Sequence, residues 1–113
     1  MALSKDLVAA SATPLILSIL SEGESYGYEI IKRVRKLSND EIKWADGMLY
    51  PVLHRLEQQG LIESHVRESE SNRKRKYYRL KNKGTKMLKE QKDQWMIVNS
   101  VLEKLWETKT CLT

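Results

Sequence analysis

The sequence predicts a mainly α-helical fold with a small β-hairpin and one long C-terminal helix. Two short amphipathic segments, residues 26–37 and 46–61, follow one another with only a polar connection between them. A basic stretch over residues 61–80 reads as two strands around a polar turn. Residues 81–106 then repeat apolar side chains at heptad spacing. This order of elements is that of a winged helix-turn-helix followed by a long C-terminal dimerisation helix.

The composition indicates a single globular domain. At 113 residues the chain can bury most of a small core, and a partner subunit would add to it. The longest apolar run, Pro14–Leu20, is too short for a bilayer, and no cationic and apolar leader opens the sequence. The single cysteine, Cys111, forms no internal disulfide and is interpreted as an incidental thiol. We therefore expect a cytoplasmic protein without membrane contact.

The positive charge is local. Residues 67–92 hold eleven Lys or Arg against three acids, a net charge of +8, whereas the remainder holds nine against twelve, a net charge of −3. Such a stripe suits a polyanion, because neutralised phosphates release their condensed counterions. By charge alone, a solvated loop and helix face explains the stripe equally well.

Residues 4–22 are expected to form the first helix, because apolar side chains recur there at helical spacing. This stripe consists of Leu7, Val8, Leu15, Ile16, Ile19 and Leu20. Pro14 lacks a backbone donor, which favours a short leading segment and a second start capped by Thr13. Leu7 and Val8 lie beyond the compact part of the domain, so we expect them to pack against a partner subunit.

The second helix is expected from Tyr26 to Leu37, with Ser25 as its cap. Its buried side is apolar and consists of Ile30, Ile31 and Val34. We expect Tyr28 to close the edge of the core. In the following connection, residues 38–45, two apolar side chains are expected to anchor a loop or short strand beside the hairpin, namely Ile42 and Trp44.

The third helix, within Asp46–Leu61, has two unlike faces. Asp46 suits its N-cap and Gly60 the left-handed turn that closes it. Its apolar face consists of Leu49, Val52, Leu53 and Leu56, and its outward face of Gly47, Met48, His54, Arg55 and Gln58. Pro51 predicts either an effective start near Leu49 or a bend.

The hairpin is predicted as a strand over Leu61–Val66, a turn over Arg67–Arg73 and a strand over Lys74–Leu80. Its inner residues are expected to be Ile62, Tyr78 and Leu80. Four consecutive cations crowd its tip and one edge, and they are Arg73, Lys74, Arg75 and Lys76. Such a tip can follow a DNA backbone or enter a minor groove.

The last helix carries the argument for a dimer. A heptad seam with spacings of three and four is formed by Leu88, Gln91, Trp95, Val98, Leu102 and Leu105. A helix of about 26 residues is roughly 39 Å long, too long to bury its stripe against so small a domain. We therefore expect a homodimer.

Three motifs resemble the PadR-like winged helix-turn-helix transcriptional regulators. They are the runs Ser25–Ile30, Gly47–Ile62 and Arg75–Leu80, in the family's order and at similar spacing. The resemblance implies a DNA-binding domain over residues 1–81, a dimerisation helix over 82–108 and a tail over 109–113. It also implies double-stranded DNA as partner, with a palindromic operator of the ATGT and ACAT type.

The resemblance assigns DNA contacts to the second helix, the third helix and the hairpin. These residues are Tyr26, Lys32, Gly47, Met48, Tyr50, Pro51, His54, Arg55, Arg73, Lys74, Arg75 and Lys76. Two of these residues have a second interpretation. Tyr26 either packs within the domain or contacts a phosphate. Arg55 either binds a phosphate or forms an ion pair with neighbouring acids. The dimer interface is expected to consist of the six seam residues together with Leu7 and Val8.

Trp95 has two interpretations. Paired indoles on a dimer seam can sandwich a flat aromatic molecule, as the resemblance implies for a drug-binding subset of the family. The pocket would be lined by Leu15, Trp95, Met96, Val98 and Asn99. In the simpler interpretation Trp95 only fills the interface.

The sequence holds no pattern for catalysis. It lacks a nucleophile elbow, a phosphate-binding glycine loop and a metal-spaced cluster, so we expect no enzyme, no cofactor and no metal. A transcriptional repressor is the expected function. The alternatives are a winged-helix protein-interaction module with a merely solubilising hairpin, and a small-molecule sensor without direct DNA readout.

Overall fold

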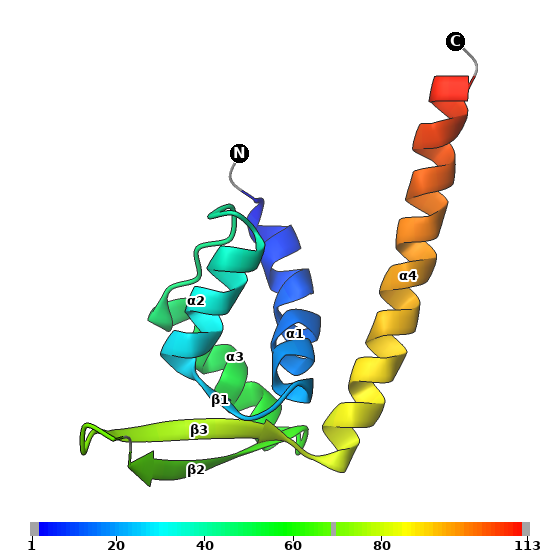
Figure 1. Cartoon of the computed structure of the whole chain (residues 1–113). Helices are drawn as coiled ribbons and strands as arrows, with labels where there is room; N and C mark the ends of the chain where they lie inside the picture. Colours follow the sequence, from blue (N-terminus) through cyan, green and yellow to red (C-terminus); the bar gives the residue numbers. More distant parts are fainter. Residues whose placement is uncertain (1–2, 69, 112–113) are drawn as a thin grey trace.

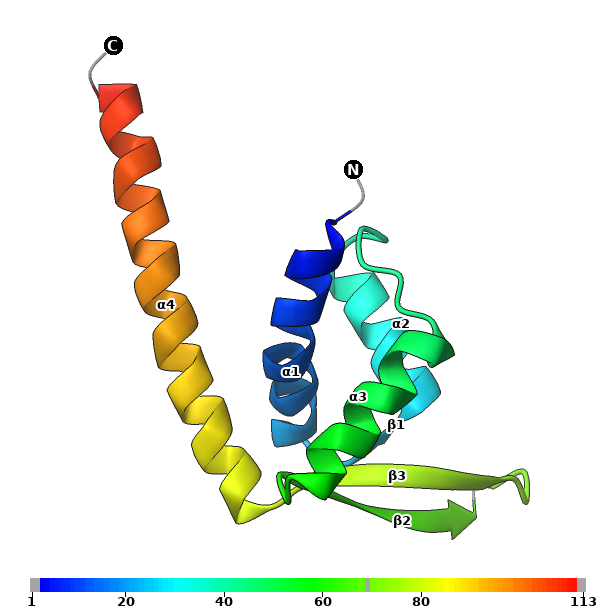
Figure 2. The same ribbon diagram turned by 180° about the vertical axis from the view of Figure 1, so that it is seen from behind.

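Three short helices lie over a small antiparallel sheet, and a long fourth helix leaves the sheet and runs beside the first (Figures 1 and 2). The computed structural model describes residues 3–68 and 70–111, with the backbone alone for 108–111. Its elements are α1 (Lys5–Ser21), β1 (Ser25–Tyr26), α2 (Gly27–Leu37), α3 (Asp46–Gln58), β2 (Ile62–Glu68), β3 (Lys74–Leu80) and α4 (Asn82–Cys111). This is the predicted winged helix-turn-helix class with a long C-terminal helix.

Helix α1 runs without a break from Lys5 to Ser21, with Pro14 inside it. The predicted second start at Thr13 is wrong. Ser4 caps the helix instead, its hydroxyl oxygen accepting a 3.2 Å hydrogen bond from the amide of Leu7. Pro14 removes one backbone bond, while the fully buried Ile16 and Leu17 hold the following turn on the core.

A third strand, β1, was not predicted. Ser25 and Tyr26 pair with Tyr78 and Tyr77 of β3, so the sheet has the order β1-β3-β2 and α2 begins only at Gly27. Ser25 does not cap α2, because its buried hydroxyl donates to the carboxylate of Glu29 at 2.6 Å.

Tyr28 does not close the core edge, since 61% of it is exposed. It stands two residues before the buried Ile30, which on a helix is the opposite side. The connection over residues 38–45 also departs from expectation. It contains no strand and lies at the end of the domain near the start of α1, away from the hairpin (Figure 1). Its Trp44 is buried in the core, as expected of an anchor.

The core lies between the three short helices and the sheet. Its fully buried large side chains are Ile16, Leu17, Ile30, Leu49, Leu53, Leu56, Leu61 and Ile62. Each contributes about 1.5–3 kcal/mol by leaving water, so α3 is fixed to the domain mainly by its three leucines.

Helix α4 spans 30 residues, about 45 Å, and continues through Cys111, beyond the predicted helix end. In its first turn, Gly84 lies close to the backbone of Leu61. A side chain at Gly84 would collide with the carbonyl oxygen of Leu61. Farther along, it exposes several large apolar side chains, namely Met96, Ile97, Val98, Val101, Leu102 and Leu105. Within the described ranges, no helix has the length and apolar character that crossing a membrane requires.

Candidate nucleic-acid interface

Helix α3 is continuous from Asp46 to Gln58. Its N-cap is Ala45 and not the predicted Asp46, which is the first helical residue and exposed. Pro51 lies inside the helix and does not move its start to Leu49. At the other end, Gly60 has the predicted left-handed conformation, with φ +75°, and the amide of Leu61 donates to the carbonyl of Leu56 at 3.0 Å.

Apart from Arg55, the exposed residues of α3 carry no cationic side chain. Gly47, Pro51 and His54 are exposed, and a Cβ atom at Gly47 would meet no other atom within 4 Å. Gln58 continues this face one turn after His54. The predicted DNA contacts do not include Gln58. Its spacing of four residues from His54 is the sequence signal that places Gln58 on the same exposed face.

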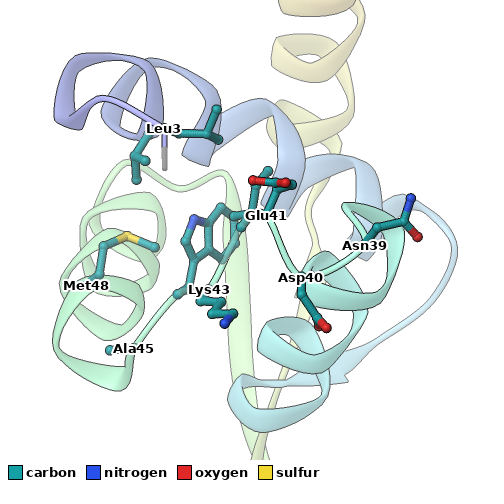
Figure 3. A pocket seen from close by; sticks show the side chains of 10 residues that line it. Leu3, Asn39, Asp40, Glu41, Lys43, Ala45 and Met48 are labelled. Atoms are coloured by element: carbon teal, nitrogen blue, oxygen red, sulfur yellow. The ribbon is translucent and has the colours of Figure 1, made fainter. Parts of the chain in front are cut away.

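Met48 does not face outward. It is half-buried against the core and lines a cavity of about 660 Å³ together with Leu3 and Trp44 (Figure 3). Met48 lies four residues before the half-buried Val52, so the two share one side of α3, and both pack against the core. This position removes Met48 from the residues that α3 presents to solvent.

Of the two contacts considered for Arg55, the structure bears only on the ion pair with an acid. The guanidinium of Arg55 donates a 3.0 Å hydrogen bond to the hydroxyl of Thr13 in α1, and among the described residues it is paired with no acid. Arg55 therefore ties α3 to α1.

A groove of about 490 Å³ lies between the start of α2, the side of α3 and strand β3. We call it the basic groove, and it is lined by Tyr26, Gly27, Tyr28, Tyr50, Arg73, Lys74, Arg75 and Lys76. The side chain of Tyr50 approaches α2 closely because residue 27 is a glycine. Any Cβ atom at this position would overlap the ring of Tyr50. The structure thus brings together three tyrosines and the four consecutive cations of the hairpin.

The four cations are not equivalent. Successive side chains of a strand point to opposite faces of the sheet, which separates Arg75 from Lys76. The Arg75 guanidinium stacks 4.3 Å from the ring centre of Tyr26, and the Lys76 ammonium lies 3.9 Å from the carboxylate of Glu57. Arg73 and Lys74 are exposed beside the turn, whose Ser69 lies outside the described residues.

The two remaining predicted contacts, Tyr26 in β1 and Lys32 in α2, have different surroundings. Tyr26 packs edge-on against Tyr77, with ring centres 5.2 Å apart, and also lines the groove, so both interpretations of this residue fit its position. Lys32 is exposed, with its ammonium 5.3 Å from the ring centre of Tyr28. Tyr28 itself was predicted as a core residue, and only the structure shows it as part of the groove.

One buried tyrosine lies behind the groove. The hydroxyl of Tyr78 has its pKa raised above 10.0, chiefly by burial and further by the charges of Glu57 and Tyr50. Tyr78 therefore remains neutral at physiological pH and adds no charge to the interface.

The predicted dimer seam has two parts. Val8 and Leu88 pack against this chain's own core, and Gln91 is half-buried. The residues that remain exposed are Leu7, Trp95, Val98, Leu102 and Leu105. The free apolar surface of α4 thus begins near its middle.

Two cavities adjoin Trp95, with volumes of about 380 and 360 Å³. They share Pro14, Ser18 and Trp95, so they lie between α1 and α4. Among the predicted ligand residues, Leu15 lines one cavity and Met96 and Asn99 line the other, whereas Val98 lines neither. In the described part of the chain, no three His, Cys, Asp or Glu side chains gather at metal-binding distance.

Comparison with known proteins gives a consistent result. The family model described as Transcriptional regulator PadR-like family matches residues 16–90. A transcriptional regulator from Clostridium thermocellum is 34% identical, with a TM-score of 0.79 over 88% of this chain and 97% of that one. A PadR-like transcriptional regulator from Bacillus cereus is 32% identical, with a TM-score of 0.79 over 89% and 96%.

A longer relative is similar over part of its length. The transcriptional regulator YqjI of Escherichia coli is 36% identical over 80 residues, which are 71% of this chain and 37% of that protein. The similarity therefore concerns one part of that regulator.

Proposed function

The chain belongs to the PadR-like family of transcriptional regulators, and from this premise we propose that it is a homodimeric repressor that binds an inverted DNA repeat and is released by a flat hydrophobic ligand. Regulators of this kind act on DNA and are not enzymes. We place its action in the cytoplasm.

The basic groove carries the proposal for DNA contact. Four cations of β3 and its turn line it, and the exposed face of α3 adjoins it at Tyr50. Cations bind phosphates without regard to sequence, whereas a helix in the major groove reads base edges. Gly47, Pro51, His54 and Gln58 are the proposed base-facing residues, while the groove and Lys32 hold the backbone.

The exposed apolar surface of α4 supports the dimer. Val98, Leu102 and Leu105 continue the heptad seam beyond the part that packs on the chain's own core. A second copy would cover this seam and repeat α3 about 34 Å away, which is one turn of DNA. A two-fold dimer of this kind requires an inverted repeat.

The cavities beside Trp95 support ligand control. They lie between α1 and α4, the two helices proposed to meet the partner subunit. A flat aromatic molecule seated there would change how α4 rests on α1 and so the distance between the two copies of α3. Repression is lifted when the ligand favours a spacing that fits DNA poorly.

The test begins with purified protein and sheared DNA from its source organism. Recovery of one inverted repeat bound at physiological salt supports the repressor. That duplex is then titrated with a planar aromatic dye. Loss of binding in wild type but not in Trp95→Ala supports ligand control, and Trp106→Ala, which lies outside both cavities, is the control and should behave as wild type. Recovery of no preferred sequence contradicts the proposal.

A further inference from the structure

Apart from Arg55, which bonds to Thr13 of α1, the hydrogen-bonding side chains exposed on α3 form one regular series. We call it the reading stripe, and it consists of Asp46, Tyr50, His54 and Gln58. Each step of four residues advances the helix by slightly more than one turn. The stripe therefore begins on the side of α3 that faces the basic groove, where Tyr50 lies, and drifts toward the centre of the exposed face.

Asp46 opens this stripe and has no partner among the described residues. Ala45 is the N-cap, which makes Asp46 the first helical residue. It is exposed and forms no hydrogen bond or ion pair among the residues that the structure describes. The other acid of α3 differs, since Glu57 accepts a hydrogen bond from Ser64 and lies beside Lys76.

A free carboxylate at this place is unusual for a surface that meets DNA. It repels phosphates, and it repels guanine, whose major-groove edge presents two acceptors. Cytosine presents an amino group there, which is a donor that a carboxylate can accept. Adenine offers a donor beside an acceptor, so it fits a carboxylate less well. The first turn of a recognition helix is also the turn that comes nearest the base edges.

We propose that Asp46 determines sequence specificity by accepting a hydrogen bond from the amino group of one cytosine in each half-site and by rejecting guanine there. This inference rests on the proposed function. It adds an acid to a contact set that otherwise contains only cations and neutral groups.

A purely structural role for Asp46 makes a different prediction. An acid in the first turn of a helix stabilises it through the helix dipole, whatever the partner. Asp6 offers the matched control, because it is also an exposed acid in a first turn, that of α1. Asp6→Asn removes the same charge from the first turn of another helix, outside the stripe.

The experiment selects bound duplexes from a randomised pool with wild type, Asp46→Asn, Asp46→Ala and Asp6→Asn. We expect a cytosine in each half-site for wild type and Asp6→Asn. Asp46→Ala loses this preference, and Asp46→Asn shifts it toward adenine, whose edge an amide matches. Replacing that cytosine pair should weaken wild-type binding about fivefold or more, the lower end of what one mismatched pair costs.

Two results would overturn the inference, and they differ from each other. If both Asp46 variants keep every base preference and bind all duplexes more tightly by one common factor, Asp46 only repels phosphate and the proposed function stands. If wild type recovers no sequence from the pool, the proposed function fails and the inference fails with it.

Discussion

The carboxylate of Glu57, in the last turn of α3, accepts a 2.5 Å hydrogen bond from the hydroxyl of Ser64 in β2. This contact joins α3, which is proposed to face the bases, to the hairpin, which is proposed to hold the DNA backbone. Leu61 and Ile62, both fully buried between the two residues, support it from the core. Together with the Lys76 ammonium, 3.9 Å from the same carboxylate, this hydrogen bond links α3 to both strands of the hairpin above an apolar base.

Ser64→Ala should loosen this link. Glu57 would keep a half-buried charge without its hydroxyl donor, so the free energy of unfolding should fall by about 1 kcal/mol. DNA affinity should fall as well, because the hairpin is held less firmly against α3. Thermal unfolding and DNA titration check both effects. Ser21→Ala is the control, since that hydroxyl bonds only to its own helix, and equal melting temperatures for the two variants would contradict the account.

Replacing Arg73 and Lys74 with Ala should weaken binding to every DNA sequence by a similar factor. Both side chains are exposed beside the hairpin turn. The slope of log affinity against log salt should shrink by about 0.9 for each phosphate that the variant no longer neutralises. Lys5→Ala with Lys104→Ala removes equal charge from the ends of α1 and α4 far from the sheet (Figure 1). An equal effect of both pairs would show that only net charge matters.

Tyr78 should make the protein sensitive to alkali. Its pKa is raised in the folded state, so it binds its proton more tightly there than in the unfolded chain. Its contribution to stability is complete below the unfolded value of about 10 and is lost as the pH rises through the folded value. The melting temperature of wild type should therefore fall relative to that of Tyr78→Phe as the pH rises above about 10. A constant difference as the pH rises would refute the linkage.

Leu102→Asp should convert a dimer to monomers, because it places a charge in the proposed seam of α4. Sedimentation velocity at micromolar concentration measures the change. Lys89→Asp alters charge on the polar side of the same helix and should leave the dimer intact. A dimer that survives Leu102→Asp would mean that the subunits meet elsewhere.

Two glycine substitutions should change stability in opposite directions. A side chain at Gly84 collides with the backbone of Leu61, so Gly84→Ala should destabilise the fold by about 1–3 kcal/mol. A side chain at Gly47 meets open space, so Gly47→Ala should stabilise α3 by about 0.5 kcal/mol. Denaturant titration distinguishes the two, and a shared sign would contradict the packing described at these sites.

Much of this architecture follows from periodic patterns in the sequence. The spacing of Leu49, Leu53 and Leu56 predicted the buried face of α3, and strand β3 has its predicted bounds. The buried face of α3 and the bounds of β3 each depend on several residues that favour the same structure. One residue that does not fit the pattern therefore leaves the helix or strand unchanged. The left-handed Gly60 was predictable because helices commonly end on such a residue.

The errors arose where distant contacts decide the local structure. Strand β1 has two residues, too few for a period, and exists because Tyr26 meets Tyr77 across 51 positions of sequence. Pro14 signals a break that burial of Ile16 and Leu17 overrides. Met48 stands at the border of the two faces of α3, and only the fold of the chain around Trp44 places it inside.

The most direct test of the central claim is hydroxyl-radical footprinting of the protein on its recovered DNA. A two-fold dimer with one α3 in each of two successive major grooves predicts two equal protected regions whose centres lie about 10 base pairs apart, related by the symmetry of the inverted repeat. A single protected region, or protection without any symmetry, would contradict the proposed mode of binding.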